Sequence, residues 1–349
     1  MARPLASACL TALVFFNAAL AAPFRRSISS PRLLTDFPDP ALLHVGDTWY
    51  VFGTQSGIDN TNVHVQVAKS GDFNTWTLLE GVDALPTLPH WVDTSNPAIW
   101  APDVVKVVST QKQMTTIHAL THCQSENQYV LYFSATTNTA GDEAYHCVGT
   151  ATSTSMTGPF IPNNEPFACP TDQGGAIDAS GFVESDGTRY VVYKIDGNAK
   201  GHGGSCGNTV SPIVSTPILI QKVHSDGITK IGSAIKILTN TVEDGPLVEA
   251  PSLIRHGSGS YILFYSSGCY VDSSYATKYA TSNSLTNEFR RGSETPLMSS
   301  GSYGLTGPGG LDASLDGLHV AFHGKSSANG GRRLLYTGLL SIDGTTVNL

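Results

Sequence analysis

The sequence predicts an all-β protein, a five-bladed β-propeller built as a single domain, and two observations support this prediction. The first is a recurring short run of β-branched and aromatic residues bounded by Gly, Asp, Asn or Ser, which is the pattern of a β-strand. The second is that no long stretch carries an apolar stripe with a 3.6-residue period. The runs begin at Tyr50, Tyr129, Tyr190, Tyr261 and His319.

The spacing of these runs favours a propeller over other all-β folds. The intervals between their first residues are 79, 61, 71 and 58 residues, and a polar insertion at about 109–127 lengthens the first interval. Self-similarity at such a period indicates a radially repeated architecture. Sheets of about four strands around an axis leave only short, protected edges. The alternative is an irregular β-sandwich or a pair of all-β domains.

The first residues have the pattern of a targeting segment. Arg3 supplies a positive charge, residues 10–20 are largely apolar, and Ala19-Leu20-Ala21 is a small-x-small cleavage site. We therefore expect residues 1–21 to be a secretory signal peptide, residues 22–349 to form the propeller, and the protein to be secreted. The apolar run is too short for a spanning helix, so we expect no membrane partner.

The charge balance bears on the class of partner. The formal net charge is −8 and charged residues make up 14% of the chain. A nucleic-acid partner would need a basic patch, which this composition does not favour. We expect a monomer without a nucleic-acid partner.

Five cysteines remain once the signal segment and Cys9 are removed: Cys123, Cys147, Cys169, Cys206 and Cys269. An exported protein meets oxidising conditions, so we expect one or two disulfides and a free thiol. Their pairing stays open at this stage. No CxxC spacing occurs, which argues against a zinc cluster.

Three acidic residues occupy similar settings in the repeat. Asp39, Asp178 and Glu249 precede the strand runs at Tyr50, Tyr190 and Tyr261 by 11, 12 and 12 residues. Carboxylates at one phase of a structural repeat are brought to one region of the fold, where they can perform acid–base chemistry. The apolar neighbours of Glu249 would raise its pKa, and a nearby Asp178 would add like-charge repulsion. The alternative for each is an ordinary acid in a turn or at a strand end.

At these residues the sequence resembles glycoside hydrolase family 43, five-bladed β-propeller enzymes that act on arabinose- and xylose-containing glycans. The resemblance covers essentially the whole chain after residue 21. It rests on four motifs in order: Phe37-Pro38-Asp39-Pro40, Trp100-Ala101-Pro102-Asp103, Ile177-Asp178-Ala179 and Glu249-Ala250-Pro251-Ser252.

The resemblance implies a role for each acid. Asp39 matches the general base that activates water, Glu249 the general acid, and Asp178 the residue that tunes the pKa of that acid and orients it. Trp100 and Asp103 match a segment that helps to form the sugar site. Such enzymes invert the anomeric centre, which places acid and base about 6.5–9.5 Å apart.

The chain departs from the family pattern in two places. The Ile-Asp-Pro usual around the residue that tunes the acid is Ile177-Asp178-Ala179 here, which is the milder change, and the other departure lies in the last repeat. Many relatives carry Gly-Pro-Gly-His there, with a histidine near the axis that can hold a metal or water, whereas this chain has Gly307-Pro308-Gly309-Gly310. We therefore predict no metal ligands and no cofactor; an axial calcium would need a substitute such as His323 or Asp312. Arg332 resembles a late arginine found near the site in some members, and a surface position is the alternative.

The favoured function is an α-L-arabinofuranosidase or arabinanase acting on arabinose- or xylose-containing polysaccharide or oligosaccharide. The sequence stops at Leu349, just after the fifth repeat, without the β-sandwich that many β-xylosidases of this family append. The alternatives are a β-xylosidase or another glycosidase of the family, and a carbohydrate-binding propeller that has lost catalysis. A retaining fructan-active enzyme is a further alternative, but it would have Glu-Cys where this chain has Glu249-Ala250.

Overall fold

The computed structural model of the chain describes residues 28, 30–59, 62–109, 126–138, 144–257, 259–292, 296–325 and 331–349. The predicted signal segment, Cys123 and most of the polar insertion lie outside these residues. In the part described, no helix is long and apolar enough to cross a membrane.

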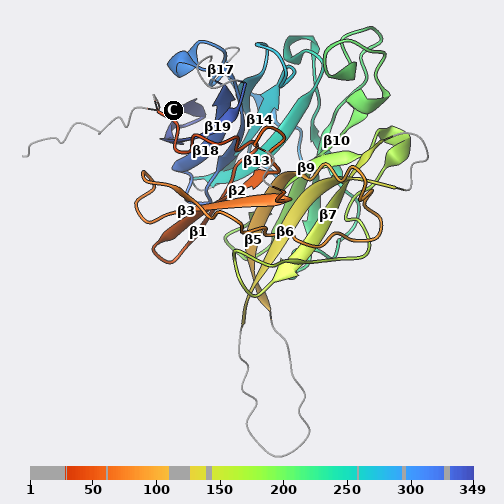
Figure 1. Cartoon of the computed structure of the whole chain (residues 1–349). Helices are drawn as coiled ribbons and strands as arrows, with labels where there is room; N and C mark the ends of the chain where they lie inside the picture. The colour runs from red at the N-terminus through yellow and green to blue at the C-terminus, as the bar shows by residue number, and fades with distance from the viewer. Residues whose placement is uncertain are drawn as a thin grey trace, which may run out of the picture.

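Five antiparallel sheets are arranged around a central axis (Figure 1). The first contains β1 (Ala41–Val45), β2 (Thr48–Thr54), β3 (Val65–Ser70) and β4 (Thr77–Leu78), and the second β5 (Trp100–Ser109), β6 (Glu126–Thr136), β7 (His146–Ser153) and β8 (Ile161–Pro162). The third contains β9 (Ala176–Val183), β10 (Arg189–Ile195), β11 (Ile218–Val223) and β12 (Ile235–Leu238), and the fourth β13 (Val248–His256), β14 (Ser260–Ser267), β15 (Ala276–Ser282) and β16 (Arg290–Arg291). The fifth contains β17 (Thr306–Ala313), β18 (His319–Lys325) and β19 (Arg333–Leu339), and a hairpin of β20 (Ser341–Asp343) and β21 (Thr346–Asn348) follows.

The helical elements are single 3₁₀ turns in the connections between strands. They are η1 (Thr171–Gln173), η2 (Gly197–Lys200), η3 (Ser205–Gly207), η4 (Val242–Asp244) and η5 (Ser302–Gly304). The five predicted strand runs all lie in the second strand of a blade, namely β2, β6, β10, β14 and β18. The all-β fold and the five-bladed propeller are thus confirmed.

The first strands of the blades surround the axis as a closed ring. Each contacts the first strand of the next blade, from β1 to β5, β9, β13 and β17, and β17 contacts β1 again. Backbone bonds from Arg32 N to Leu335 O and from Phe37 N to Arg333 O tie the beginning of the chain to β19. The N-terminal segment therefore covers the outer edge of the last blade, which an open sheet would expose.

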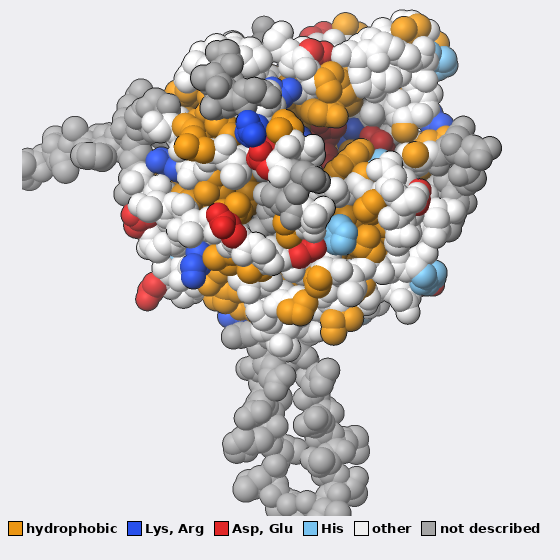
Figure 2. Space-filling model, in the orientation of Figure 1, with side chains coloured by type: hydrophobic (Ala, Val, Ile, Leu, Met, Phe, Trp, Pro, Cys, Tyr) orange, Lys and Arg blue, Asp and Glu red, His pale blue; other side chains and the backbone are white. Residues whose placement is uncertain are grey.

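The hydrophobic core is divided among the five interfaces between blades. Each of five buried clusters joins two neighbouring blades, for example Val51 of the first blade with Leu335 of the fifth, or Val192 of the third with Leu263 of the fourth. Burial of these apolar faces stabilises the ring by roughly 25 cal/mol per Å² of apolar surface. On the face shown in Figure 2, charged side chains of both signs are scattered among hydrophobic and uncharged surface.

One irregularity recurs at the top of each first strand. The residues at this point are Asp39, Ala101, Asp178, Ala250 and Gly310, with φ of 50, 42, 57, 49 and 57°. Strand pairing shifts register around this residue in the second, third, fourth and fifth blades. A bulge of this kind bends the strand and redirects side chains. It therefore sets which residues of each blade reach the axis.

Candidate active site

The five left-handed residues form a ring around one pocket on the axis. The pocket is lined by the same three positions of each first strand: 39–41, 101–103, 178–180, 250–252 and 310–312. Its upper ring holds Asp39, Ala101, Asp178, Ala250 and Gly310, and its lower ring holds Ala41, Asp103, Ser180, Ser252 and Asp312. Two of the three predicted acids thus share one ring position. Glu249 comes one residue earlier in its strand.

Asp39 is surrounded by groups that favour its ionised form. Its Oδ2 accepts a hydrogen bond of 2.7 Å from Thr54 Oγ1, and Arg333 Nη1 lies 3.4 Å from its Oδ1. Burial would raise the pKa of Asp39, but the Arg333 guanidinium and the Thr54 hydroxyl hold it below the ordinary value of 3.8. A carboxylate that stays ionised can accept a proton.

Asp178 has the opposite character. Burial and then the charge of Glu249 raise the pKa of Asp178 to about 8, and Lys194 only partly opposes this shift. Its Oδ2 accepts a hydrogen bond of 2.8 Å from Ala250 N, the residue directly after Glu249. Asp178 therefore carries a proton near neutral pH and fixes the backbone beside Glu249.

Both carboxylate oxygens of Glu249 accept a hydrogen bond. Lys194 Nζ donates to Oε2 over 3.0 Å, and Tyr275 Oη donates to Oε1 over 2.8 Å. Lys194 lies on β10 and is only 1% exposed, and its Nζ also lies 2.9 Å from Asp196 Oδ1. Burial alone would lower the pKa of Lys194, but the three surrounding carboxylates raise it, so it remains charged. One buried cation thus lies between Glu249 and Asp196.

The sequence model of glycosyl hydrolases family 43 matches residues 28–334, which include this ring, the first four blades and the fifth blade as far as the beginning of β19. The chain belongs to this family. The family is one of glycosyl hydrolases.

Two curated proteins are similar in sequence to part of this chain. An extracellular endo-α-(1→5)-L-arabinanase of Thermotoga petrophila is 26% identical over 44% of this chain and 33% of its own length. A β-D-galactofuranosidase of Aspergillus niger is 24% identical over 74% of this chain and 64% of its own length. The chain thus spans about one third of the length of the arabinanase and slightly under two thirds of the length of the galactofuranosidase.

Solved structures of similar fold agree with the propeller assignment. A thermostable family-43 glycoside hydrolase is 22% identical, with a TM-score of 0.69 over 90% of this chain and 92% of the other. A Bacillus subtilis arabinanase is 20% identical, with a TM-score of 0.61 over 90% and 97%. At this level of identity the likeness concerns the fold alone.

Trp100 has the same position in the second blade as Glu249 has in the fourth, directly before the left-handed residue of the upper ring. Its indole stacks on the ring of His146, with ring centroids 3.8 Å apart, and is 37% exposed. One face of the indole is thus supported by protein while part of it remains open. Burial lowers the pKa of His146 to about 4, so the supporting ring is neutral.

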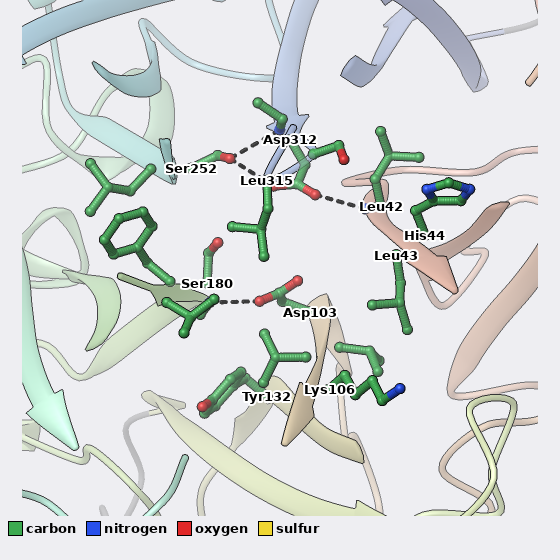
Figure 3. Close-up of a pocket in the computed structure, with 18 of the residues that line it drawn as sticks. Leu42, Leu43, His44, Asp103, Lys106, Tyr132, Ser180, Ser252, Asp312 and Leu315 are labelled. Carbon is green, nitrogen blue, oxygen red and sulfur yellow. Dashed lines mark hydrogen bonds between the residues drawn. The ribbon is translucent and has the colours of Figure 1, made fainter. Parts of the chain in front are cut away.

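Asp103 lies two residues further along its strand than the upper ring, which is about 6–7 Å deeper along the axis. Its Oδ2 accepts a hydrogen bond of 2.7 Å from Gly181 N. It lines, with Asp312, a cavity of about 280 Å³ formed by all five first strands (Figure 3). The structure therefore places Trp100 and Asp103 at different depths, and the predicted sugar contact of Asp103 stays a prediction.

The late arginine near the acids is Arg333 rather than Arg332. Arg332 Nη2 binds Asp59 Oδ1 over 2.7 Å, away from the axis. Arg333 approaches Asp39, and its guanidinium lies 5.2 Å from the ring centroid of the exposed Tyr270. Sequence reasoning missed Arg333, Lys194 and Tyr275. For Lys194 a signal existed, because it is a lysine inside the strand run Tyr190-Val191-Val192-Tyr193-Lys194-Ile195.

The axial calcium that the family resemblance implies does not fit the residues of the last blade. The expected histidine position is Gly310, and a Cβ atom there would lie 2.8 Å from His323 Nδ1 and 3.3 Å from Asp39 Oδ1. His323 Nδ1 already accepts a hydrogen bond from Asp39 N over 3.0 Å. Among the residues described, no group of three or more His, Cys, Asp or Glu is arranged to hold a metal ion.

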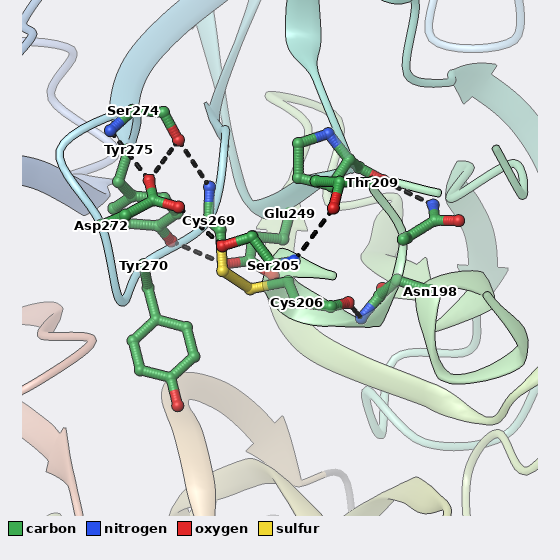
Figure 4. The surroundings of a disulfide bond; sticks show 12 residues. Asn198, Ser205, Cys206, Thr209, Glu249, Cys269, Tyr270, Asp272, Ser274 and Tyr275 are labelled. Atoms are coloured by element: carbon green, nitrogen blue, oxygen red, sulfur yellow. Dashed lines mark hydrogen bonds between the residues drawn. A yellow bond between two sulfur atoms is a disulfide. The ribbon is translucent and has the colours of Figure 1, made fainter. Parts of the chain in front are cut away.

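Two disulfides join the four cysteines that the structure describes, Cys147 to Cys169 and Cys206 to Cys269. The second lies beside Glu249 and Tyr275 (Figure 4). Next to it, Ser205 Oγ donates a hydrogen bond of 2.7 Å to Asp272 Oδ2. The bridge thus ties the connection after β10 to the loop between β14 and β15, which carries Tyr270 and Tyr275.

We predict that stability falls as pH rises through the neutral range. Burial, followed by a neighbouring carboxylate, raises the pKa of Asp178 and Asp103 to about 8, and burial raises that of Asp312 to about 6, from 3.8. These three carboxyl groups bind more protons in the folded state than in the unfolded state between pH of about 4 and 8, so they make the free energy of unfolding decrease across that window. His146 and His323, whose pKa values burial lowers to about 4 and about 3, act in the opposite direction below pH of about 6.5, but two histidines do not outweigh three carboxyl groups.

Thermal melts at pH 5 and pH 8 measure this effect, and we expect the higher Tm at pH 5. Asp103→Asn keeps an oxygen that can accept the Gly181 bond, and it should flatten the dependence. A Tm that rises from pH 5 to pH 8 contradicts the prediction.

Proposed function

We propose that this protein is a secreted, inverting glycosidase that cleaves arabinose-containing plant cell-wall glycans, as an α-L-arabinofuranosidase or arabinanase. The observation that supports this most is the contrast on the axis between two carboxyl groups: the pKa of Asp39 is lowered, and the pKa of Asp178, the residue beside the proposed acid, is raised. When neighbouring environments shift the pKa values of two carboxyl groups in opposite directions, the contrast is the usual basis for assigning base and acid roles.

In the proposed mechanism Asp39 is the general base. Its carboxylate accepts a proton from a water molecule, which attacks the anomeric carbon from the side opposite the leaving group. Thr54 and Arg333 hold the carboxylate in place and keep it ionised before the proton arrives.

Glu249 is the general acid that protonates the departing glycosidic oxygen. Asp178 keeps one proton in the pair of carboxyl groups near neutral pH, which is the pKa-tuning role that the motif implies. Once Glu249 has given up its proton, Lys194 and Tyr275 stabilise the resulting carboxylate through the hydrogen bonds described above.

The choice of sugar rests on the relatives and on the shape of the site. Both curated relatives have names that refer to an arabinan or a furanoside. The open part of the Trp100 indole, supported from behind by His146, provides a surface on which a sugar ring can stack. Secretion rests on the predicted signal segment and on the extracellular relative.

The test is sugar release by the purified protein from linear arabinan, arabinoxylan and aryl glycosides of α-L-arabinofuranose, β-D-xylose and β-D-galactofuranose. We expect release of arabinose or arabino-oligosaccharides, and loss of that release in Glu249→Ala. Proton NMR of the first product formed should show an anomer opposite to that of the substrate.

Three results would overturn parts of this proposal. Preferential cleavage of the xyloside or galactofuranoside would replace arabinose-containing glycans with xylose- or galactofuranose-containing glycans as the proposed substrates. Retention of the anomer would exclude the inverting mechanism. Binding to these glycans without release from any of them would indicate a carbohydrate-binding propeller that has lost catalysis.

A further inference from the structure

We propose that two stacked side chains, Tyr275 and His323, form a positioning unit: together they fix the placement of the general base on the first blade relative to the general acid on the fourth. This inference rests on the proposed function and adds to it residues that set the geometry between the two acids. The fifth blade lies between the first and fourth blades, and it has glycine in the upper ring where its neighbours have Asp39 and Ala250.

His323 holds the base end of the unit. It lies on β18, is 1% exposed, and its Nδ1 accepts the backbone N–H of Asp39 over 3.0 Å. Burial, followed by the charges of Arg333 and Lys325, lowers the pKa of His323 to about 3. The carboxylate of Asp39 raises it, but by less. The ring is therefore neutral, and the 3.3 Å approach of Nδ1 to Asp39 Oδ1 is not an ion pair.

Tyr275 holds the acid end. It lies just before β15, is 2% exposed, and donates its hydroxyl hydrogen to Glu249 Oε1 over 2.8 Å. Its ring is parallel to that of His323, with an interplanar angle of 5° and ring centroids 5.9 Å apart. A continuous series of contacts thus runs from the backbone of Asp39 through two buried rings to the carboxylate of Glu249.

The glycine pair of the last blade makes room for these rings. A Cβ atom at Gly309 would lie 2.1 Å from Tyr275 Cε1, and one at Gly310 would lie 2.8 Å from His323 Nδ1. Contacts this short do not occur in folded proteins, so any larger residue would displace a ring. The departure of this chain from Gly-Pro-Gly-His therefore has a structural consequence, because the space beside Asp39 is filled by His323 from the next strand.

The matched substitutions are His323→Asn and His323→Gln. The Asn oxygen can take the place of Nδ1 and accept the Asp39 N–H, whereas the Gln amide reaches towards Nε2, which is buried without a hydrogen-bond partner among the described residues. We expect Asn to keep kcat within about threefold, and Gln to lower it by about tenfold to a hundredfold, as a small misplacement of reacting groups does.

Tyr275→Phe keeps the stack and removes the hydroxyl that donates to Glu249 and that also hydrogen-bonds the Ser266 side chain. We expect kcat to fall about tenfold with KM little changed, and the alkaline limb of the kcat/KM profile to move. His224→Asn, the same change at an exposed histidine just after β11 that does not line either axial pocket, is the control and should leave the kinetics unaltered.

Circular dichroism and Tm on each variant separate positioning from folding. Equal kcat values for the Asn and Gln variants, both folded, would overturn the role of His323, and an unchanged pH profile in Tyr275→Phe would overturn that of Tyr275. Failure of the proposed function is distinct, because the wild-type protein would then release no sugar. If arabinan is not cleaved but another glycoside is, the same variants are compared on that substrate.

Discussion

Asp39→Asn is expected to lower kcat by about 10²–10⁴-fold on every glycoside, whatever its leaving group, because the general base is needed to activate water in each case. Asparagine tolerates the left-handed backbone that Asp39 adopts, with a φ of 50°, and its side-chain oxygen can still accept the Thr54 bond. The variant should therefore fold as the wild type does.

Glu249→Gln is expected to behave differently. It should abolish cleavage of arabinan, whose leaving alcohol needs a proton, and retain much of the wild-type kcat on a 2,4-dinitrophenyl glycoside, whose leaving group departs without one. The measurement is kcat for both variants on the polysaccharide and on a series of aryl glycosides of decreasing leaving-group pKa. A reversed pattern would exchange the roles of the two acids, and an identical pattern in both variants would remove the division between acid and base.

The propeller could be predicted because each blade contains a strand-forming run that can be recognised from a short stretch of sequence. Tyr50, Tyr129, Tyr190, Tyr261 and His319 each fall in the second strand of a blade, where apolar and β-branched residues face the interfaces between blades on both sides. Because every blade needs such a strand, the run recurs in each blade even where loop insertions change the interval between runs. Pairing of Cys206 with Cys269 could not be predicted in the same way, since it depends on how two loops from adjacent blades approach each other.

The axial acids could be predicted only in part. Asp39 and Asp178 share one ring position, whereas Glu249 is one residue earlier, so the similar spacing to the following strand concealed a difference in placement. The reason is the bulge at the top of each first strand, which changes the direction of successive side chains. The same bulge separates Trp100 from Asp103 in depth, although they are three residues apart in one motif.

The contacts of Lys194, Tyr275 and His323 with the acids could not be predicted from the sequence, because none of the three lies in the first strand of a blade. The lysine inside a strand run is a signal for Lys194 but does not show what it contacts, and the sequence indicates His323 only as a possible calcium ligand. Lys194 and His323 belong to second strands, and Tyr275 to a loop. They reach the acids across the width of a blade or through the gap that Gly309 and Gly310 leave. Their roles depend on distances between blades, which local patterns do not encode.

Lys194→Met is expected to reduce the free energy of unfolding by about 3–5 kcal/mol, the usual result of removing one partner of a buried ion pair. Lys194 is 1% exposed and lies 2.9 Å from Asp196 and 3.0 Å from Glu249. Methionine matches its length but leaves these two carboxylates, with Asp178 close by, uncompensated in a buried site. Urea or thermal denaturation of the variant and the wild type at one pH measures the difference.

The double variant Lys194→Met/Glu249→Gln should recover part of this loss, because the second change removes one of the charges left unpaired. The loss should also be smaller at pH 4.5 than at pH 7.5, since protonation of the unpaired carboxylates relieves their repulsion and the folded state then binds the additional protons. Lys69→Met, at an exposed lysine of β3, is the matched control and should change stability by less than about 0.5 kcal/mol. Equal losses in the single and double variants would show that Lys194 acts through its packing and not through the charge of Glu249.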